Sequence, residues 1–399
     1  MDGGRGLIIL VVLFFGIIRP WGMGQSPEST LKILQSMDAV RGEQLFHDKG
    51  CFDCHSYDNW GEMFGPDLGP NRIRGASPSS LAAAMWNHAP SMWSGIRSGS
   101  SSGNVPSLST DESAAIFAFF YSRLYFNDLS DSPRGEDLFK SRCASCHDLR
   151  VTTGSSKPGP PVASWGNIKD PIALVGRMWN HSVEMLDQSL RAGRSWPRLS
   201  AQDSTDIVAY LWRLPEVRPG KSAFTFGDDT KGRNVFSAQC KGCHTLDSAS
   251  SADKIDLTSR LRGVTIPQMI AAMWNHAPAM KVRQPGIPLP ALNEADTRDL
   301  MTYFVVGRVL QETGNATRGG QIFNDKACGR CHGGPIRDTG APALSAIKGP
   351  IDAVRMTAAL WSHGPKMLDM MNRENIKWPR FKGPEMLDLL TYMTRQSAK

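Results

Sequence analysis

All eight cysteines of this 399-residue chain fall into four copies of one motif, Cys-x-x-Cys-His, with none left over. The first cysteines of successive copies are 92, 97 and 88 residues apart. In this spacing two thiols can add to the two vinyl groups on one edge of a porphyrin, and the adjacent histidine can reach the iron. The four copies are Cys51, Cys54 and His55; Cys143, Cys146 and His147; Cys240, Cys243 and His244; and Cys328, Cys331 and His332.

Three other chemistries compete for such cysteine pairs. An even number of cysteines in an exported protein is typical of disulfides, but disulfides leave the recurrent histidine unexplained. Zinc ribbons use two cysteine pairs about 15–20 residues apart, which is far closer than these pairs lie. A redox pair of the thioredoxin type needs a strand–helix–strand context, which the sequence pattern does not offer. We therefore predict four covalently attached haem c groups, each with its iron bound by one of the four motif histidines.

A second signature, Trp-x-His-x-x-x-Met, follows each motif histidine by about 30 residues. Histidine and methionine both bind haem iron as axial ligands, so each is a candidate for the sixth ligand. The four copies are Trp86, His88 and Met92; Trp179, His181 and Met185; Trp274, His276 and Met280; and Trp361, His363 and Met367.

Further repeated elements frame these residues. A basic residue, Gly and Phe precede each cysteine pair, and a Pro-x-Leu/Phe sequence precedes a helical pattern that closes each copy. In the second copy Ser200 is a good N-cap, and residues 207–214 place apolar side chains at i, i+3, i+4 and i+7. No run has the alternating pattern of a strand. We expect an all-α fold of four tandem helical units: residues 25–130, 131–222, 223–313 and 314–399, called units 1 to 4 below.

These motifs resemble the class I cytochrome c family, and the resemblance covers essentially all of the chain after residue 24. It implies that Gly42 and Phe46, with their counterparts, lie on an N-terminal helix that crosses the closing helix near an aromatic residue such as Tyr210. It also implies a proline carbonyl that steadies each motif histidine, in loops at Gly65–Pro66, Gly159–Pro160 and Ala341–Pro342. Unit 3 has no proline at residues 255–257, which puts this hydrogen bond in doubt there.

The chain departs from that family at the sixth ligand. The family usually has Met directly before the proline of the closing sequence, where this chain has Val105, Trp196, Leu289 and Trp378. We expect Met92, Met185, Met280 and Met367 to replace it, because they lie nearer that loop. The alternatives are His88, His181, His276 and His363, or an open iron in at least one unit. Proline inside the second signature is expected to kink the helix, so that His and Met point differently. We expect Trp86, Trp179, Trp274 and Trp361 to pack on haem, with their indole N–H bonded to a propionate.

The N-terminus predicts export. Residues 7–18 form one apolar run, preceded by Arg5 and followed by small residues around Gly22 and Gly24. At 12 residues the run is shorter than the roughly 20 that span a bilayer, so residues 1–24 are predicted to be a signal peptide, with an uncleaved anchor as the alternative. An exported haem protein of this kind is expected in a bacterial periplasm.

Composition narrows the class of function. A hydrophobic fraction of 41% and a charged fraction of 21% are typical of a globular protein and exclude a wholly disordered chain. The net charge of +7 is spread along the chain without a basic block, so we expect no nucleic-acid partner. We predict a tetrahaem electron carrier, not an enzyme, that meets redox partner proteins and associates at most peripherally with a membrane respiratory complex. The alternatives are an enzyme subunit with one open haem, peroxidase-like or acting on small anions, and a subunit of a conducting filament.

Overall fold

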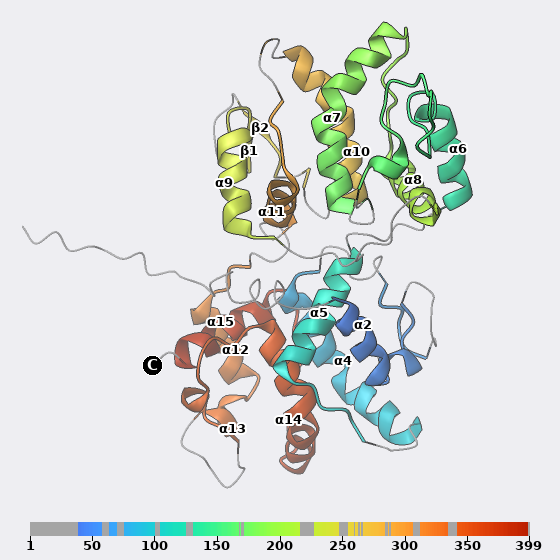
Figure 1. Ribbon diagram of the computed structural model, residues 1–399. Coiled ribbons are helices and arrows are strands. Elements are labelled where there is room, and N and C mark those ends of the chain that lie inside the picture. Colours follow the sequence, from blue (N-terminus) through green and yellow to red (C-terminus); the bar gives the residue numbers. More distant parts are fainter. Residues whose placement is uncertain are drawn as a thin grey trace, which may run out of the picture.

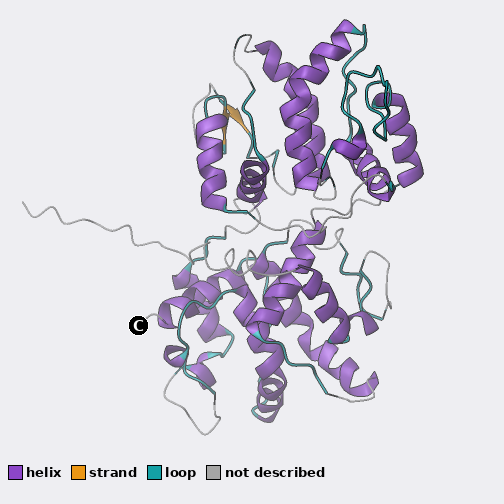
Figure 2. Ribbon diagram, in the orientation of Figure 1, coloured by secondary structure: helices purple, strands orange, loops and turns teal. Residues whose placement is uncertain are grey.

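A computed structural model describes residues 39–57, 64–69, 76–99, 104–124, 131–166, 168, 171–215, 227–246, 254–258, 260–261, 264, 266–283, 286, 289–305, 312–333 and 341–397. The predicted signal peptide lies outside these residues. Within them the chain is helical apart from loops and one pair of two-residue strands, as Figure 2 shows. The expected all-α class is therefore confirmed. Among the described residues, no helix is both long and apolar enough to cross a membrane.

Four copies of one helix pair form the frame. In each copy the helix before the cysteine pair packs against the closing helix of the same unit. The pairs are α2 (Ala39–Asp48) with α5 (Thr110–Leu124), α6 (Ser132–Arg142) with α8 (Ala201–Arg213), α9 (Asp229–Gln239) with α11 (Glu294–Val305), and α12 (Ala316–Asp325) with α15 (Glu385–Ser397).

The repeated glycine explains why these helices cross so closely. A Cβ at Gly135 would lie well under 3.0 Å from the backbone carbonyl oxygen of Asp206, so only a residue without a side chain fits. The same overlap recurs at Gly42, Gly232 and Gly319. One turn later, Phe139 lies against Tyr210 with ring centroids 5.8 Å apart. The crossing implied by the family resemblance is therefore present in all four pairs.

Polar contacts fix the start of three of these pairs. The Asp131 side chain caps α6 by accepting from the backbone N–H of Arg134, and its own N–H donates to Asp206 at 2.7 Å. Arg134 also forms ion pairs with Asp203 and Asp206. Units 3 and 4 repeat the backbone contact, from Asp228 to Asp299 and from Asn315 to Asp388.

The second signature lies on a long helix in every unit. These Trp-x-His helices are α4 (Pro78–Gly99), α7 (Pro171–Arg191), α10 (Ile266–Arg283) and α14 (Ala353–Arg373). Helices α4, α10 and α14 run on through Pro90, Pro278 and Pro365 without ending there. Because helix residues i and i+4 share a face, the His and Met of each copy lie on the same side of their helix. The His and Met of each copy therefore lie on successive turns of one helix.

The remaining elements are short. They are η1 (Cys51–Asp53), η2 (Val162–Ser164), α13 (Gly329–His332) and η4 (Leu344–Ala346), with the parallel strands β1 (His244–Thr245) and β2 (Ile255–Asp256). The strand pair was not expected from the sequence. It forms where unit 3 lacks the loop proline, and the backbone N–H groups of Ile255 and Leu257 donate there to the carbonyls of Cys243 and Thr245, each at 2.9 Å.

The units associate out of chain order. Helix α7 of unit 2 packs on α10 of unit 3, and α4 of unit 1 packs on α14 of unit 4. Figure 1 shows the result as two halves, with α6 to α11 in the upper one and α2, α4, α5 and α12 to α15 in the lower one.

Candidate haem sites

Each Cys-x-x-Cys-His motif forms one tight turn at the end of the first helix. In unit 2 the backbone N–H of Cys143 still donates to Phe139, and the N–H of His147 donates to the Cys143 carbonyl at 2.9 Å. The same bond from the histidine back to the first cysteine recurs in the other three motifs, each at 2.9 Å. Both thiols and the imidazole thereby come from a single turn of backbone, as the predicted haem attachment requires. None of the eight cysteines forms a disulfide.

The first cysteine of each pair is partly buried against apolar side chains. Desolvation raises the pKa of Cys51 to about 12 and the pKa of Cys143, Cys240 and Cys328 to about 11. These surroundings disfavour a free thiolate at the first sulfur of each pair. Among the described residues, no three His, Cys, Asp or Glu side chains gather as a metal-ion site.

Proline carbonyls orient three of the four motif histidines. Nδ1–H of His55 donates to Pro66 at 2.9 Å, that of His147 to Pro160 at 2.8 Å and that of His332 to Pro342 at 2.9 Å. This confirms the hydrogen bond that the resemblance implied. A hydrogen bond at Nδ1 fixes the ring and leaves Nε2 as the ligand atom, which is the usual arrangement around a metal.

Unit 3 is the exception that the sequence anticipated. Nδ1 of His244 is buried and has no proline carbonyl as a partner, although the backbone of Ile255 lies close enough to act on the pKa of the ring. The residue lies at the start of β1, where backbone bonds join residues 243 and 245 to β2.

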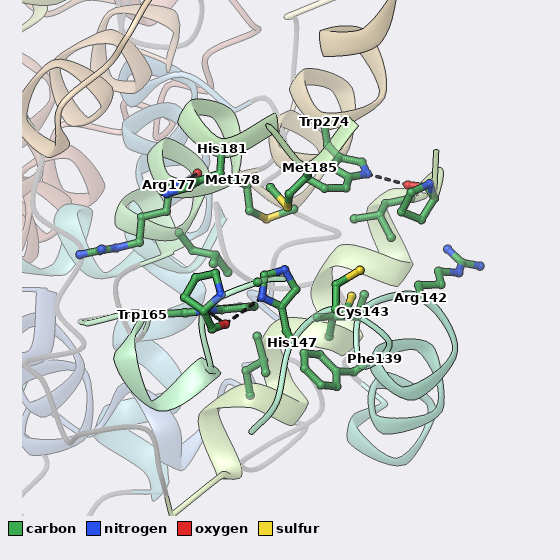
Figure 3. A pocket seen from close by; sticks show the side chains of 18 of the residues that line it. Phe139, Arg142, Cys143, His147, Trp165, Arg177, Met178, His181, Met185 and Trp274 are labelled. Atoms are coloured by element: carbon green, nitrogen blue, oxygen red, sulfur yellow. Dashed lines mark hydrogen bonds between the residues drawn. The ribbon is translucent and has the colours of Figure 1, made fainter. Parts of the chain in front are cut away.

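A cavity of about 300 Å³ lies between the motif and the Trp-x-His helix of unit 2. Figure 3 shows His147 and Cys143 on one side, with Met178, His181 and Met185 of α7 on the opposite side. Most of its lining is apolar, with Phe139, Leu174, Ile207 and Leu211 among the side chains. A flat apolar group bound through both cysteines and His147 fits this setting.

In units 3 and 4 the second-signature histidine lies beside the motif histidine. The ring centroids of His244 and His276 are 6.0 Å apart, and those of His332 and His363 are 6.1 Å apart. Two imidazoles that share one metal need about 6 Å, since each metal–nitrogen bond is about 2 Å and each ring centre lies about 1 Å behind its nitrogen. Nε2 of His363 is moreover buried without a hydrogen-bond partner. Both pairs thus leave room for one metal atom between two nitrogens.

Burial favours the neutral form of four of the candidate ligand histidines, and the neutral form is the one that binds a metal. Burial lowers the pKa of His147, His244, His276 and His363. In units 1 and 2 the Trp-x-His histidine is also oriented, because Nδ1–H of His88 donates to Ala84 at 2.8 Å and that of His181 to Arg177 at 2.9 Å. Both bonds leave Nε2 available.

The four methionines expected as ligands lie close by, one turn further along each helix. Met185 lines the unit 2 cavity together with His181. Met92, Met280 and Met367 are half-buried and pack against the hydrophobic core. Met178, directly before the unit 2 signature Trp, also lines the cavity and was not anticipated. The paired rings of units 3 and 4 favour histidine over these sulfurs.

From the sequence we expected each signature tryptophan to donate its indole N–H to a propionate, but three of the four donate to a backbone carbonyl. Trp86 donates instead to the carbonyl of Pro379 at 2.8 Å, Trp179 to Pro290 at 2.7 Å and Trp274 to Pro197 at 2.6 Å. Each acceptor belongs to another unit. The N–H of Trp361 is buried without a partner. Trp86 and Pro379 lie 293 positions apart in the chain, so no local sequence pattern indicates this contact.

Trp165 is a site residue that the sequence did not reveal. Its ring lies edge-on to His147 with centroids 5.1 Å apart, and its N–H donates to the Pro160 carbonyl that also binds His147. The residue occurs in one unit only, so the repeat pattern gave no reason to choose it.

Comparison with known proteins agrees with this geometry. Residues 132–215 match the family model for cytochrome c. No curated protein and no solved structure matches the chain. The matched segment contains α6, α7, α8, the Cys143–His147 turn and most of the residues that line the cavity described above. Residues 132–215 are therefore similar to a cytochrome c domain, a kind of domain that carries covalently bound haem c.

Proposed function

We propose that this chain is a tetrahaem c-type cytochrome that carries electrons between redox partner proteins. The observation that carries the proposal is the pairing of imidazoles at 6.0 and 6.1 Å beside two of the Cys-x-x-Cys turns. An iron held from both sides exchanges electrons without offering a position to a substrate. Electron transfer thus fits these residues better than catalysis at an open iron.

Four haem groups follow from the repetition of one arrangement. Every unit has the partly buried first cysteine, the one-turn motif and the glycine-mediated helix crossing that unit 2 has. We therefore extend the cytochrome c assignment from residues 132–215 to units 1, 3 and 4, with the boundaries expected from the sequence. Haem c would supply the redox chemistry, and the chain attaches it, orients its ligands and shields it from water.

We further propose His88, His181, His276 and His363 as the sixth ligands. The facing rings in units 3 and 4 support this choice, and the oriented Nδ1 atoms in units 1 and 2 extend it. Two histidines donate more strongly to ferric iron than histidine and methionine do, so the reduction potentials would lie below those of His/Met cytochromes. The methionines would then serve as apolar packing one helical turn away.

The location and the partners are also part of this proposal. The apolar segment at residues 7–18 supports export, and a bacterial periplasm is the compartment that fits an exported haem c protein. The partners would be other redox proteins, among them a membrane respiratory complex that the chain contacts peripherally.

Two measurements on the purified protein test the function. The haem content should be four per chain, and the fully reduced native protein should bind no carbon monoxide. Fewer than four haems would overturn the tetrahaem assignment. Carbon monoxide binding at one haem would instead favour an enzyme subunit with an open iron, and reversible assembly into long polymers would favour a filament.

A further inference from the structure

The second signature of one unit binds the closing loop of another unit, and in units 2 and 3 it does so reciprocally. We call residues 106–108, 197–199, 290–292 and 379–381 the Pro-x-Leu/Phe loops. Trp179 and Asn180 of unit 2 donate to the unit 3 loop at Pro290 and Leu292, at 2.7 and 2.6 Å. In return, Trp274 and Asn275 of unit 3 donate to the unit 2 loop at Pro197 and Leu199, each at 2.6 Å.

Each asparagine also accepts a bond from the loop it contacts. The backbone N–H of Leu292 donates to Asn180 at 2.9 Å, and the N–H of Leu199 donates to Asn275 at 3.0 Å. The side-chain amide therefore pairs with one loop residue through both its oxygen and its nitrogen. This two-bond match makes the contact specific for backbone in one register.

The second signature of unit 1 makes the same contacts with the loop of unit 4, and the second signature of unit 4 makes fewer contacts with the loop of unit 1. Trp86 donates to Pro379, and Asn87 pairs with both the carbonyl and the N–H of Phe381 at 2.8 Å each. In return, Ser362 stands where the other units have Asn and donates to Leu108 at 3.1 Å. The contact zone is dense, because a Cβ at Gly364 would overlap the ring of Trp93.

One helix borders two sites as a result. His276 of α10 faces His244 within unit 3, whereas Trp274 and Ile270 of the same helix line the cavity that holds His147 of unit 2. Trp274 stacks there on Trp196 with ring centroids 4.1 Å apart. Figure 3 shows Trp274 beside the same cavity as His147. In units 1 and 4, Trp86 stacks on Trp378 at 4.8 Å. The two sites of a pair are thus separated by little more than one helix, whose width is about 10–12 Å with side chains.

We propose that the redox centres form two close pairs, unit 2 with unit 3 and unit 1 with unit 4, each joined across a stacked tryptophan pair. The inference rests on the proposed function. The Pro-x-Leu/Phe loop lies where the resembled family usually has its sixth ligand, but in this chain the loop binds the Trp and Asn of the neighbouring unit. Electrons then pass fastest within these pairs, and the order of the centres in space differs from their order in the chain.

Pairing has a measurable electrostatic consequence. Adding an electron to one centre makes its neighbour harder to reduce, and this repulsion falls with distance. The largest mutual effects should therefore lie within the two pairs. Neighbours in the chain that belong to different pairs, such as units 1 and 2, should affect one another less.

The test changes one centre and identifies which other centre responds. His276→Met should raise the reduction potential of the unit 3 haem, so that this haem is reduced first. The unit 2 haem should then show the largest downward shift among the other three in a redox titration followed by NMR. Val282→Thr, an exposed position on the same helix, is the matched control and should shift none. A larger shift in unit 4 or unit 1 than in unit 2, or equal shifts in all, would overturn the pairing.

The unaltered protein provides a second test that does not depend on the ligand assignment. In the fully reduced state each haem can be assigned through contacts to its own cysteine protons. Magnetisation transfer should connect the unit 2 haem with the indole protons of Trp274, which belongs to unit 3 and lines the unit 2 cavity. Contacts between units 1 and 2 or units 3 and 4 alone would overturn the pairing while leaving the function intact. Fewer than four haems per chain would instead overturn the proposed function itself.

Discussion

Alanine at Gly135 should separate the helices that frame the unit 2 site. A Cβ there would lie well under 3.0 Å from the Asp206 carbonyl oxygen and at 3.0 Å from the Tyr210 Cβ. Ordinary carbon–oxygen contacts begin at about 3.3 Å, so α6 and α8 must move apart by on the order of 1 Å. This displacement stretches the contacts of Arg134 with Asp206 and of Phe139 with Tyr210, which join the same two helices.

The expected cost follows from these contacts. Overpacking a close helix crossing costs about 1–3 kcal/mol, and each weakened hydrogen bond adds about 1 kcal/mol. A loss of about 2 kcal/mol lowers the melting temperature of a unit this size by roughly 8–16 °C. The matched control is Gly95→Ala, on the exposed face of α4 with no atom within 4 Å of the new Cβ. That change should stabilise its helix by about 0.5–1 kcal/mol.

Thermal unfolding followed at both the haem absorption band and the far-ultraviolet circular dichroism measures both variants. The reasoning is refuted if Gly135→Ala melts within 2 °C of the parent protein, a difference well below the shift of about 4–8 °C that each kcal/mol produces. It is equally refuted if Gly95→Ala destabilises as much as Gly135→Ala does.

Three further outcomes are expected. Asn275→Ala removes both hydrogen bonds with Leu199 and should lower the free energy of unfolding by about 1–3 kcal/mol, measured by thermal unfolding. Asn275→Ser, which imitates Ser362, should lower it less. Equal stability of both variants and the parent would contradict the docking role. Burial would raise the pKa of Asp203, but the Ser200 backbone N–H, Arg142 and Arg134 outweigh it and hold the pKa at about 2. Because the folded pKa is lowered, Asp203→Asn should cost up to about 2 kcal/mol at pH 7, and the difference should vanish as the pH falls from about 4 to 2; a difference independent of pH would contradict this. His276→Ala should let one reduced haem per chain bind carbon monoxide, whereas Met280→Ala should let none bind, and the reverse result would restore methionine as the ligand.

Much of the fold was predictable because it depends on local rules. Ser200 caps α8, as the sequence predicted, through a reciprocal contact with Asp203, and Ser109 and Glu112 make the same pair of contacts at the start of α5. The Cys-x-x-Cys-His turns and the glycine crossing are set by residues a few positions apart or by a recurring pair of motifs. The proline carbonyls on His55, His147 and His332 followed from the same short-range pattern.

The rest depends on distances that a repeated sequence does not encode. Trp86 and Pro379 both belong to recurring signatures, yet four equivalent copies of each leave their pairing open. We therefore expected the indole N–H of Trp86 to donate to a propionate, whereas its acceptor is a backbone carbonyl 293 positions away. The preference for methionine over histidine rested on how near each lies to the closing loop along the chain, whereas the facing rings of His244 with His276 and of His332 with His363 join segments that are distant in the sequence. The joint recurrence of the Trp-Asn and Pro-x-Leu/Phe sequences was the available signal for a contact between units.

The most direct test of the central proposal, four haem irons each closed by two histidines, is the absorption spectrum of the oxidised protein at known chain concentration. Four low-spin haems per chain should appear, without the weak band at the red end that marks methionine sulfur bound to ferric iron. A sulfur band that scales with all four haems would contradict the histidine assignment and make Met92, Met185, Met280 and Met367 the sixth ligands. A high-spin contribution from the native protein would contradict the closed sites themselves.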